Sequence, residues 1–253
     1  MPHPAPDRRS AALEVTSHLL ISHLEVTSES SAFELPKLRL RGASRTAAAD
    51  GSPSEPPAAA LDEELIRKMR RFAHAPALRR LAVLIEASLV GQQDNASIRR
   101  HILAFRLADR AGLGVLTAAD LAEALRERGV EPPTDLELIC RCVDMGKGQG
   151  AINLIEFVAA TMEPRLYCEP RLCRAAFRVL DADGDGAITV ADLEALLADS
   201  PQRAETARAI IRSARPDADG RIDFKRFCEV LVPKLSNPGL ATAVAAYMAE
   251  SFV

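Results

Sequence analysis

The feature that most constrains this chain is a repeat in its second half: helical stretch, glycine-containing loop, aliphatic residue, helical stretch, four times over. The loop glycines are spaced 36, 36 and 34 residues apart, and an aliphatic residue follows each glycine two positions later. A single unit of this kind cannot bury its apolar face alone, so such units pack in pairs. The repeat predicts an all-α fold with two lobes, in which the aliphatic residues join neighbouring loops through a short two-strand contact. The loop glycines are Gly114, Gly150, Gly186 and Gly220.

The composition favours helices and argues against some partners. Aromatic residues make up only 4% of the chain and tryptophan is absent, whereas alanine, leucine, arginine and glutamate, which favour helices, are abundant. A net charge of -3 gives no general attraction to nucleic acid or to a membrane surface. No apolar run approaches the roughly 18 residues of a membrane span, and the first residues lack the order of a secretory signal. We therefore expect a cytoplasmic protein without a nucleic-acid partner or a membrane span.

The cysteines predict reduced thiols and no zinc site. There are five of them, an odd number, and they lie in helical contexts. Cys140 and Cys142 are close in sequence, but no second close pair of cysteines or histidines accompanies them.

The third loop, DADGDGAITVAD, has the spacing of an EF-hand calcium loop. Such a loop supplies oxygens from positions 1, 3, 5, 7 and 9 and a carboxylate from position 12, with glycine at position 6 for the turn. Calcium requires this because it is a hard cation that takes six to eight oxygen ligands. Loop three therefore predicts a bound Ca²⁺. The predicted ligands are Asp181, Asp183, Asp185, Ala187 through its carbonyl, Thr189 and Asp192.

Position 12 of this loop departs from the usual pattern. Asp192 stands where glutamate is preferred, and its side chain is one methylene shorter. We expect weaker calcium binding and a smaller preference over Mg²⁺ at the same site. Thr189 to Asp192 is also a T-x-x-D sequence at a helix start, so a capping role and a ligand role can coexist.

The first two loops are expected to hold no ion. The first loop places Ala111 and Leu113 where oxygens are required. Position 1 of the second loop is Met145 and position 3 is Lys147, whereas a start at Asp144 makes a loop of thirteen residues.

The fourth loop carries arginines at both ends. It retains Asp217, Asp219 and Asp223, but Arg215 and Arg226 occupy positions 1 and 12. One hypothesis is that the guanidinium of Arg226 substitutes for the metal among these carboxylates. The alternative is that both arginines point to solvent and the loop is degenerate.

The chain divides into five segments by composition and repeat. The N-terminal segment, rich in Ser, Ala and Pro, is expected to be mostly disordered, and the last segment is expected to form a helical tail. Between them lie a basic amphipathic segment and the two EF-hand lobes. The boundaries are 1–60 for the disordered region, 61–95 for the basic helices, 96–165 for the first lobe, 166–233 for the second lobe and 234–253 for the tail.

Residues 62–90 combine apolar residues at helical spacing with arginine and lysine, and Pro76 divides them into two helices. These helices either cover part of the core or occupy a groove of the calmodulin type, and the two interpretations are compatible. We expect this segment to dock on the EF-hand region and to bury Phe72, Leu81 and Leu84.

Residues 72–233 resemble the regulatory half of calcium-dependent protein kinases. The resemblance is strongest over EFVAATMEPRLYCEPRLCRAAFRVLDADGDGAITVADL, and RRFAHAPALRRLAVLIEASL resembles the segment that follows the kinase domain in that family. It implies a junction segment and a calmodulin-like domain, whose calcium binding moves the junction helix away from the kinase. The sequence itself shows no glycine-rich phosphate loop, H-R-D or D-F-G motif, so we expect no enzyme activity.

These observations predict a calcium-binding EF-hand regulatory or sensor protein that engages a protein partner through an amphipathic helix. A kinase is one candidate partner. Two alternatives stay open: a structural adaptor whose EF-hands are mostly free of ions, and a fragment of a calcium-dependent protein kinase.

Overall fold

The computed structural model describes residues 61–91, 96–145, 149–197 and 201–232. The predicted disordered region 1–60 and the predicted tail 234–253 lie outside the described residues.

The described part of the chain is mostly helical, as predicted, and its strands are only two residues long. No helix within it is both long and apolar enough to cross a lipid bilayer. In chain order the elements are α3 (Glu63–Ala73), α4 (Ala77–Gly91), α5 (Ala96–Ala108), β1 (Val115–Leu116), α6 (Ala118–Arg126), α7 (Leu136–Val143), β2 (Ile152–Asn153), α8 (Leu154–Thr161), α9 (Pro164–Tyr167), α10 (Pro170–Leu180), β3 (Ala187–Ile188), α11 (Val190–Leu196), α12 (Arg203–Ser213), β4 (Ile222–Asp223) and α13 (Phe224–Leu231).

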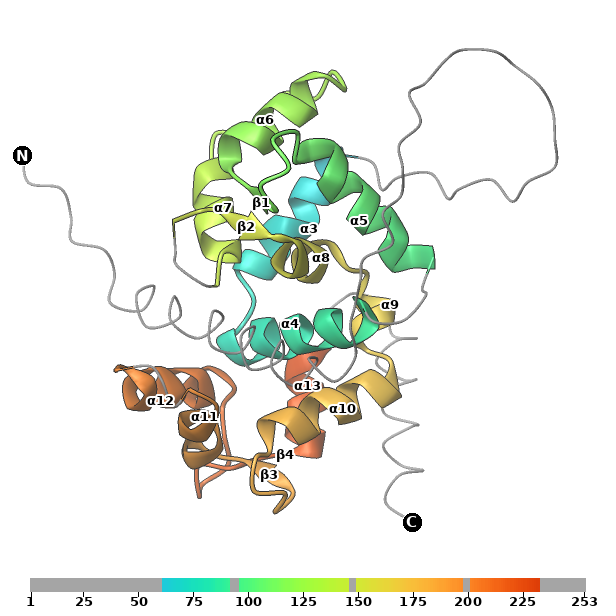
Figure 1. Ribbon diagram of the computed structural model, residues 1–253. Helices are drawn as coiled ribbons and strands as arrows, with labels where there is room; N and C mark the ends of the chain where they lie inside the picture. The colour runs from blue at the N-terminus through green and yellow to red at the C-terminus, as the bar shows by residue number, and fades with distance from the viewer. Residues whose placement is uncertain (1–60, 92–95, 146–148, 198–200, 233–253) are drawn as a thin grey trace, which may run out of the picture.

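The strands join the helical units in pairs. β1 pairs with β2 and β3 pairs with β4, both antiparallel. The registers place Leu116 opposite Ile152 and Ile188 opposite Ile222, and all four of these side chains are fully buried. The aliphatic residue that follows each loop glycine is therefore the point at which two loops meet. One half of the structure runs from α5 to α8 and the other from α10 to α13 (Figure 1).

A side-chain cap starts the second helix of every unit. The residue that ends each loop strand, or follows it, accepts a hydrogen bond from the backbone N–H three positions later. In the first three units the partner side chain returns a bond to the cap residue, which completes a capping box. The caps are Thr117, Asn153, Thr189 and Asp223.

Helix α3 packs against the first half, and α4 packs against both halves. Asp62 caps the start of α3, because its side chain accepts a 2.9 Å bond from the Leu65 N–H, and α3 ends before Pro76. α3 contacts α7 and α8, whereas α4 lies between the halves and contacts α8 on one side and α10, α12 and α13 on the other (Figure 1). The side chains of Phe72, Leu81 and Leu84 are 7, 1 and 1% exposed. α4 carries buried apolar side chains on more than one face, and such a helix is stable only when it is enclosed in this way.

Two adjacent arginines of α4 cap helices from opposite halves. Arg79 donates from Nε to the Val230 carbonyl at 2.6 Å and from Nη2 to the Val232 carbonyl at 3.2 Å, at the end of α13. Arg80 donates from Nη1 to the Cys142 carbonyl at 2.8 Å, in the last turn of α7. The last carbonyls of a helix lack partners within the helix and carry partial negative charge, so a guanidinium there is favourable.

Glu86 is the one carboxyl on α4. It is 0% exposed, and neither carboxyl oxygen has a hydrogen-bond partner among the described residues. Burial raises the pKa of Glu86 well above its usual value. Enclosure of α4 therefore disfavours the charged form of Glu86.

Aromatic edges and thiols fill the interior of each half. Phe105 meets Phe157 edge-on at 5.6 Å between ring centres, and Phe177 meets Phe227 at 5.5 Å. All five cysteines are free; Cys142 is partly buried and the other four are buried.

The first half also encloses a histidine. His101 lies on α5 and its Nδ1 is 3.1 Å from the hydroxyl oxygen of Thr161 on α8. Burial lowers the pKa of His101 from 6.5 to about 4, and the nearby charge of Lys68 adds to this effect.

The depressed pKa of His101 predicts a loss of stability as pH falls from about 6.5 toward about 4. The unfolded chain takes up a proton on this ring in that range, whereas the folded chain does not, so protons favour unfolding. We expect the free energy of unfolding of the wild type to fall by about 2 kcal/mol more between pH 7 and pH 5 than that of His101→Gln. Urea unfolding at the two pH values measures the difference, and equal losses in both proteins would show that the ring is not buried in its neutral form.

Candidate metal centre

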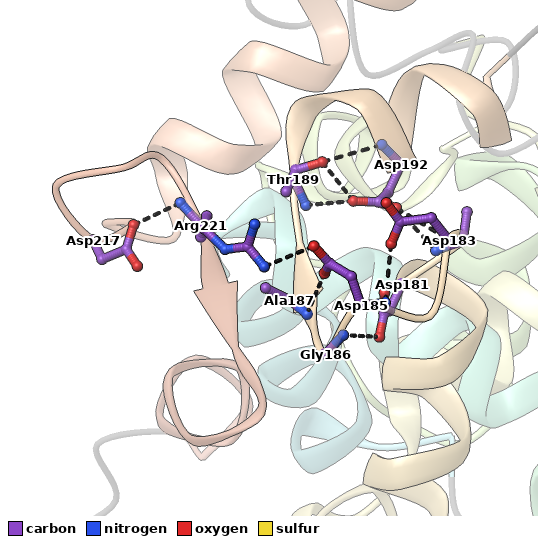
Figure 2. Close-up of polar contacts among 10 residues, drawn as sticks. Asp181, Asp183, Asp185, Gly186, Ala187, Thr189, Asp192, Asp217 and Arg221 are labelled. Atoms are coloured by element: carbon purple, nitrogen blue, oxygen red, sulfur yellow. Dashed lines mark hydrogen bonds and ion pairs between the residues drawn. The ribbon is translucent and has the colours of Figure 1, made fainter.

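The third loop brings three carboxylates together between α10 and β3. Asp181 directly follows α10, and Gly186 turns the chain into β3 with φ of 89°. One carboxylate oxygen each from Asp181, Asp183 and Asp185 lies within 4.8 Å of the other two. Among the described residues this is the only group of three acidic, histidine or cysteine side chains so close together (Figure 2).

Backbone N–H groups hold these acids in place. Gly186 donates to Asp181 Oδ2 at 3.1 Å, Asp185 donates to Asp183 Oδ1 at 3.0 Å, and Ala187 donates to Asp185 Oδ1 at 3.0 Å. Bonds to N–H groups favour the charged form of a carboxylate and offset part of the mutual repulsion. Each acid is thus tied to the loop through one oxygen.

The second oxygen of Asp181 is different. Asp181 is only 7% exposed, and its Oδ1 is a buried oxygen with no hydrogen-bond partner. A buried acceptor without a partner costs about 1 to 3 kcal/mol, and more when it is charged. A hard cation bound beside Asp183 and Asp185 would satisfy this oxygen, so the donor set fits a calcium ion.

Asp192 and Thr189 close the loop on itself. Asp192 Oδ2 accepts bonds from the Thr189 N–H at 2.7 Å and from the Thr189 hydroxyl at 2.5 Å. Asp192 Oδ1 accepts from the N–H groups of Ala182 at 3.1 Å and Asp183 at 3.3 Å. The predicted capping role of Asp192 is confirmed. Ala187, the remaining predicted ligand, is buried in β3 beside the three acids (Figure 2).

The first loop uses its leading carboxylate for its own backbone. Asp109 accepts from the Leu113 N–H at 2.9 Å and from the Gly114 N–H at 2.8 Å. Leu113 projects into solvent at the position where a ligand oxygen is required.

The second loop closes from Asp144 rather than from Met145. Asp144 Oδ2 accepts the Gly150 N–H at 2.9 Å, as Asp181 accepts that of Gly186 in the third loop. Glu156 Oε1 accepts the Met145 N–H at 2.9 Å. The hydrogen-bonding pattern therefore matches the thirteen-residue alternative.

The hypothesis of a metal-replacing Arg226 is wrong. Its guanidinium lies 3.5 Å from Glu229, one turn further along α13, and only its backbone N–H contacts Asp223. A helix residue reaches its neighbours three and four positions away more readily than the loop behind it. Arg215 begins the loop in a left-handed conformation, with φ of 54°.

Arg221 is the cation that lies between the third and fourth loops. Its Nη2 lies 2.8 Å from Asp185 Oδ2, so a side chain of the fourth loop pairs with an acid of the third (Figure 2). This hydrogen-bonded pair lowers the pKa of Asp185. The contact was not predicted, although the strand pairing gives a signal for it. Arg221 directly precedes Ile222, which pairs with Ile188 of the third loop.

Comparisons with known proteins agree with this geometry. A family model described as an EF-hand domain pair matches residues 169–232, the half that contains β3 and β4. Calcium-dependent protein kinase 5 of Plasmodium falciparum is 29% identical over 175 residues, which cover 68% of this chain and 30% of the relative. Calcium-dependent protein kinase 7 of Oryza sativa is 29% identical over 182 residues, which cover 72% of this chain and 32% of the relative.

The predicted resemblance is confirmed by these relatives. The chain spans about a third of the length of the curated proteins that it matches. The EF-hand pair also supports the prediction of Ca²⁺ as the cofactor, since its one cluster of acids has oxygen ligands of the kind that calcium requires. Residues 169–232 are thus an EF-hand domain pair, in a chain that is similar over 68 to 72% of its length to calcium-dependent protein kinases.

Proposed function

We propose that this protein is a calcium-binding regulatory module that holds one Ca²⁺ in its third loop. The observation that carries the proposal is the unpartnered, buried Oδ1 of Asp181 beside two further carboxylates. Asp181, Asp183 and Asp185 would supply side-chain oxygens and Ala187 its carbonyl. Thr189 and Asp192 would complete the shell, directly or through water, and Mg²⁺ is the competing ion.

We propose further that all four helical units are EF-hands, in lobes 96–165 and 166–233, and that three of them work without metal. Each of these three loops uses an aspartate to hold its own backbone. Asp109 does so in the first loop, Asp144 in the second and Asp217 in the fourth. An ion-free loop that is closed by its own hydrogen bonds remains a folded partner for its neighbour.

The partner helix in this proposal is already part of the chain. Helices α3 and α4 would occupy the surfaces that EF-hand lobes use to capture amphipathic helices, and the burial of Leu81 and Leu84 supports this for α4. Calcium in the third loop would act on α4 through α10, because Asp181 directly follows α10 and α10 packs on α4. If calcium releases α3 and α4 from the lobes, these helices would contact another protein. The similarity to calcium-dependent protein kinases makes a kinase domain the first candidate for that partner.

The enclosure of α4 also favours the alternative, a structural adaptor in which the lobes stay closed and calcium is incidental. Adjacent arginines of α4 tie both halves to one helix, and this arrangement needs no ion. Calcium-dependent exposure of α4 separates the two functions.

The first prediction concerns the site. Asp181→Asn keeps the shape of the side chain but removes the charge and one acceptor oxygen, and it should abolish calcium binding. Asp109→Asn, the matched change at position 1 of the first loop, should leave binding unchanged. Calorimetric titration with and without about 1 mM magnesium measures stoichiometry and selectivity together. Two or more tight sites in the wild type would contradict a single third-loop site.

Position 12 gives the second prediction. Asp192→Glu adds the methylene that allows both oxygens to reach the ion, so calcium affinity should rise by about tenfold. The second loop shows that such a position accepts glutamate, since Glu156 bonds the N–H of Met145 at one end and of Asn153 at the other. Asp120→Glu, at the capping position of the first loop, serves as the control. Unchanged affinity in Asp192→Glu would mean that position 12 acts only as a cap.

A third prediction separates sensor from adaptor. Calcium should increase hydrogen exchange in α4 and the binding of an apolar dye in the wild type, and neither change should occur in Asp181→Asn. If the wild type binds calcium without either response, the adaptor is the better description.

A further inference from the structure

We propose that Arg221 of the fourth loop is a built-in competitor of calcium for Asp185, and that it sets the affinity of the third loop. This inference rests on the proposed function, because it concerns the same site. It assigns a role to the fourth loop: that loop presents a cation to its neighbour instead of binding one.

The fourth loop holds the backbone of Arg221 firmly. Asp217 Oδ1 accepts the Arg221 N–H at 2.7 Å, and the Asp217 N–H donates to the Arg221 carbonyl at 3.0 Å. Ile222, the next residue, is fully buried and paired with Ile188. The side chain of Arg221 therefore starts from a fixed point beside the third loop, and Figure 2 shows it extending to Asp185.

Both oxygens of Asp185 are engaged without any metal. Oδ1 accepts the Ala187 N–H at 3.0 Å, and Oδ2 is paired with the Arg221 guanidinium at 2.8 Å. Asp181, in contrast, keeps one oxygen without a partner. An ion that enters the loop finds Asp181 ready to bind but must displace or share the partner of Asp185.

The size of the effect follows from exposure. The side chains of Arg221 and Asp185 are each 40% exposed, so water and salt screen their attraction. An exposed ion pair of this kind changes an equilibrium about two- to fivefold. Repulsion between the guanidinium and a divalent ion acts in the same direction.

The coupling is reciprocal. If Arg221 weakens calcium binding, calcium must weaken the bond of Arg221 to Asp185 by the same factor. Occupation of the third loop therefore releases a side chain of the fourth, and the two loops communicate although only one binds metal.

The test is calcium calorimetry on the full chain, with Arg221→Gln, Arg221→Lys and the control Arg226→Gln. Arg226 lies in the same half, is similarly exposed and pairs with Glu229 instead of the third loop. We expect Arg221→Gln to bind one calcium about two- to tenfold more tightly than the wild type, and Arg226→Gln to match the wild type. The calcium affinity of Arg221→Lys, which keeps the charge, should lie between those of the wild type and Arg221→Gln.

Salt gives a second readout. The difference in calcium affinity between the wild type and Arg221→Gln should shrink as potassium chloride rises from about 0.05 M to about 0.5 M. The reason is that salt screens the attraction between Arg221 and Asp185.

Calcium-free unfolding tests the pair without any ion. In a chelator, the effects of Arg221→Gln and Asp185→Asn on the melting temperature should be less than additive, since either change breaks the same contact.

The outcomes separate the two proposals. Equal affinities for the wild type and Arg221→Gln, with binding still abolished by Asp181→Asn, would overturn the role of Arg221 and leave the calcium site intact. Absence of calcium binding in every protein would overturn both. A gain in affinity in Arg226→Gln equal to that in Arg221→Gln would show a general effect of surface charge and would also overturn the inference.

Discussion

The arrangement of the two halves of the structure depends on α4, which is enclosed between them. Each half has its own strand pair and its own aromatic contacts, but the halves meet chiefly through α4, whose apolar side chains face both of them. Adjacent arginines attach α4 to both halves, since Arg79 caps α13 and Arg80 caps α7. Neighbouring residues on a helix point about 100° apart. A rotation of α4 therefore moves both arginines at once, so the two contacts together tie both halves to the orientation of α4.

The loops differ in where their carboxylates are used. In the first, second and fourth loops the leading acid is consumed by backbone N–H groups, and the loop is complete without an ion. In the third loop three carboxylates cluster closely, and one buried oxygen of Asp181 has no hydrogen-bond partner. Under the proposed function, metal binding would depend on a surplus of acceptors over donors.

Local sequence signals predicted what depends on local geometry. The aliphatic residue after each loop glycine located both strand pairs, Pro76 located the break between α3 and α4, and the T-x-x-D sequence located the cap at Asp192. Contacts of long side chains were not predicted. Arg79, Arg80 and Arg221 reach partners that are 36 to 153 residues away in sequence. A flexible arginine has several polar groups within reach, and which one it meets is decided by packing. Arg226 shows the same limit, because a nearby glutamate on its own helix replaced the predicted partners.

Glu86 makes the docking of α4 a proton-linked event. Burial raises the pKa of its carboxyl in the enclosed helix, whereas water favours the ionised form at neutral pH. Withdrawal of α4 into water would therefore favour loss of the proton from Glu86, and its return would favour uptake of a proton. The raised pKa means that a lower pH favours the enclosed helix and a higher pH favours its release. Local acidity and calcium would then act in opposite directions on the same helix.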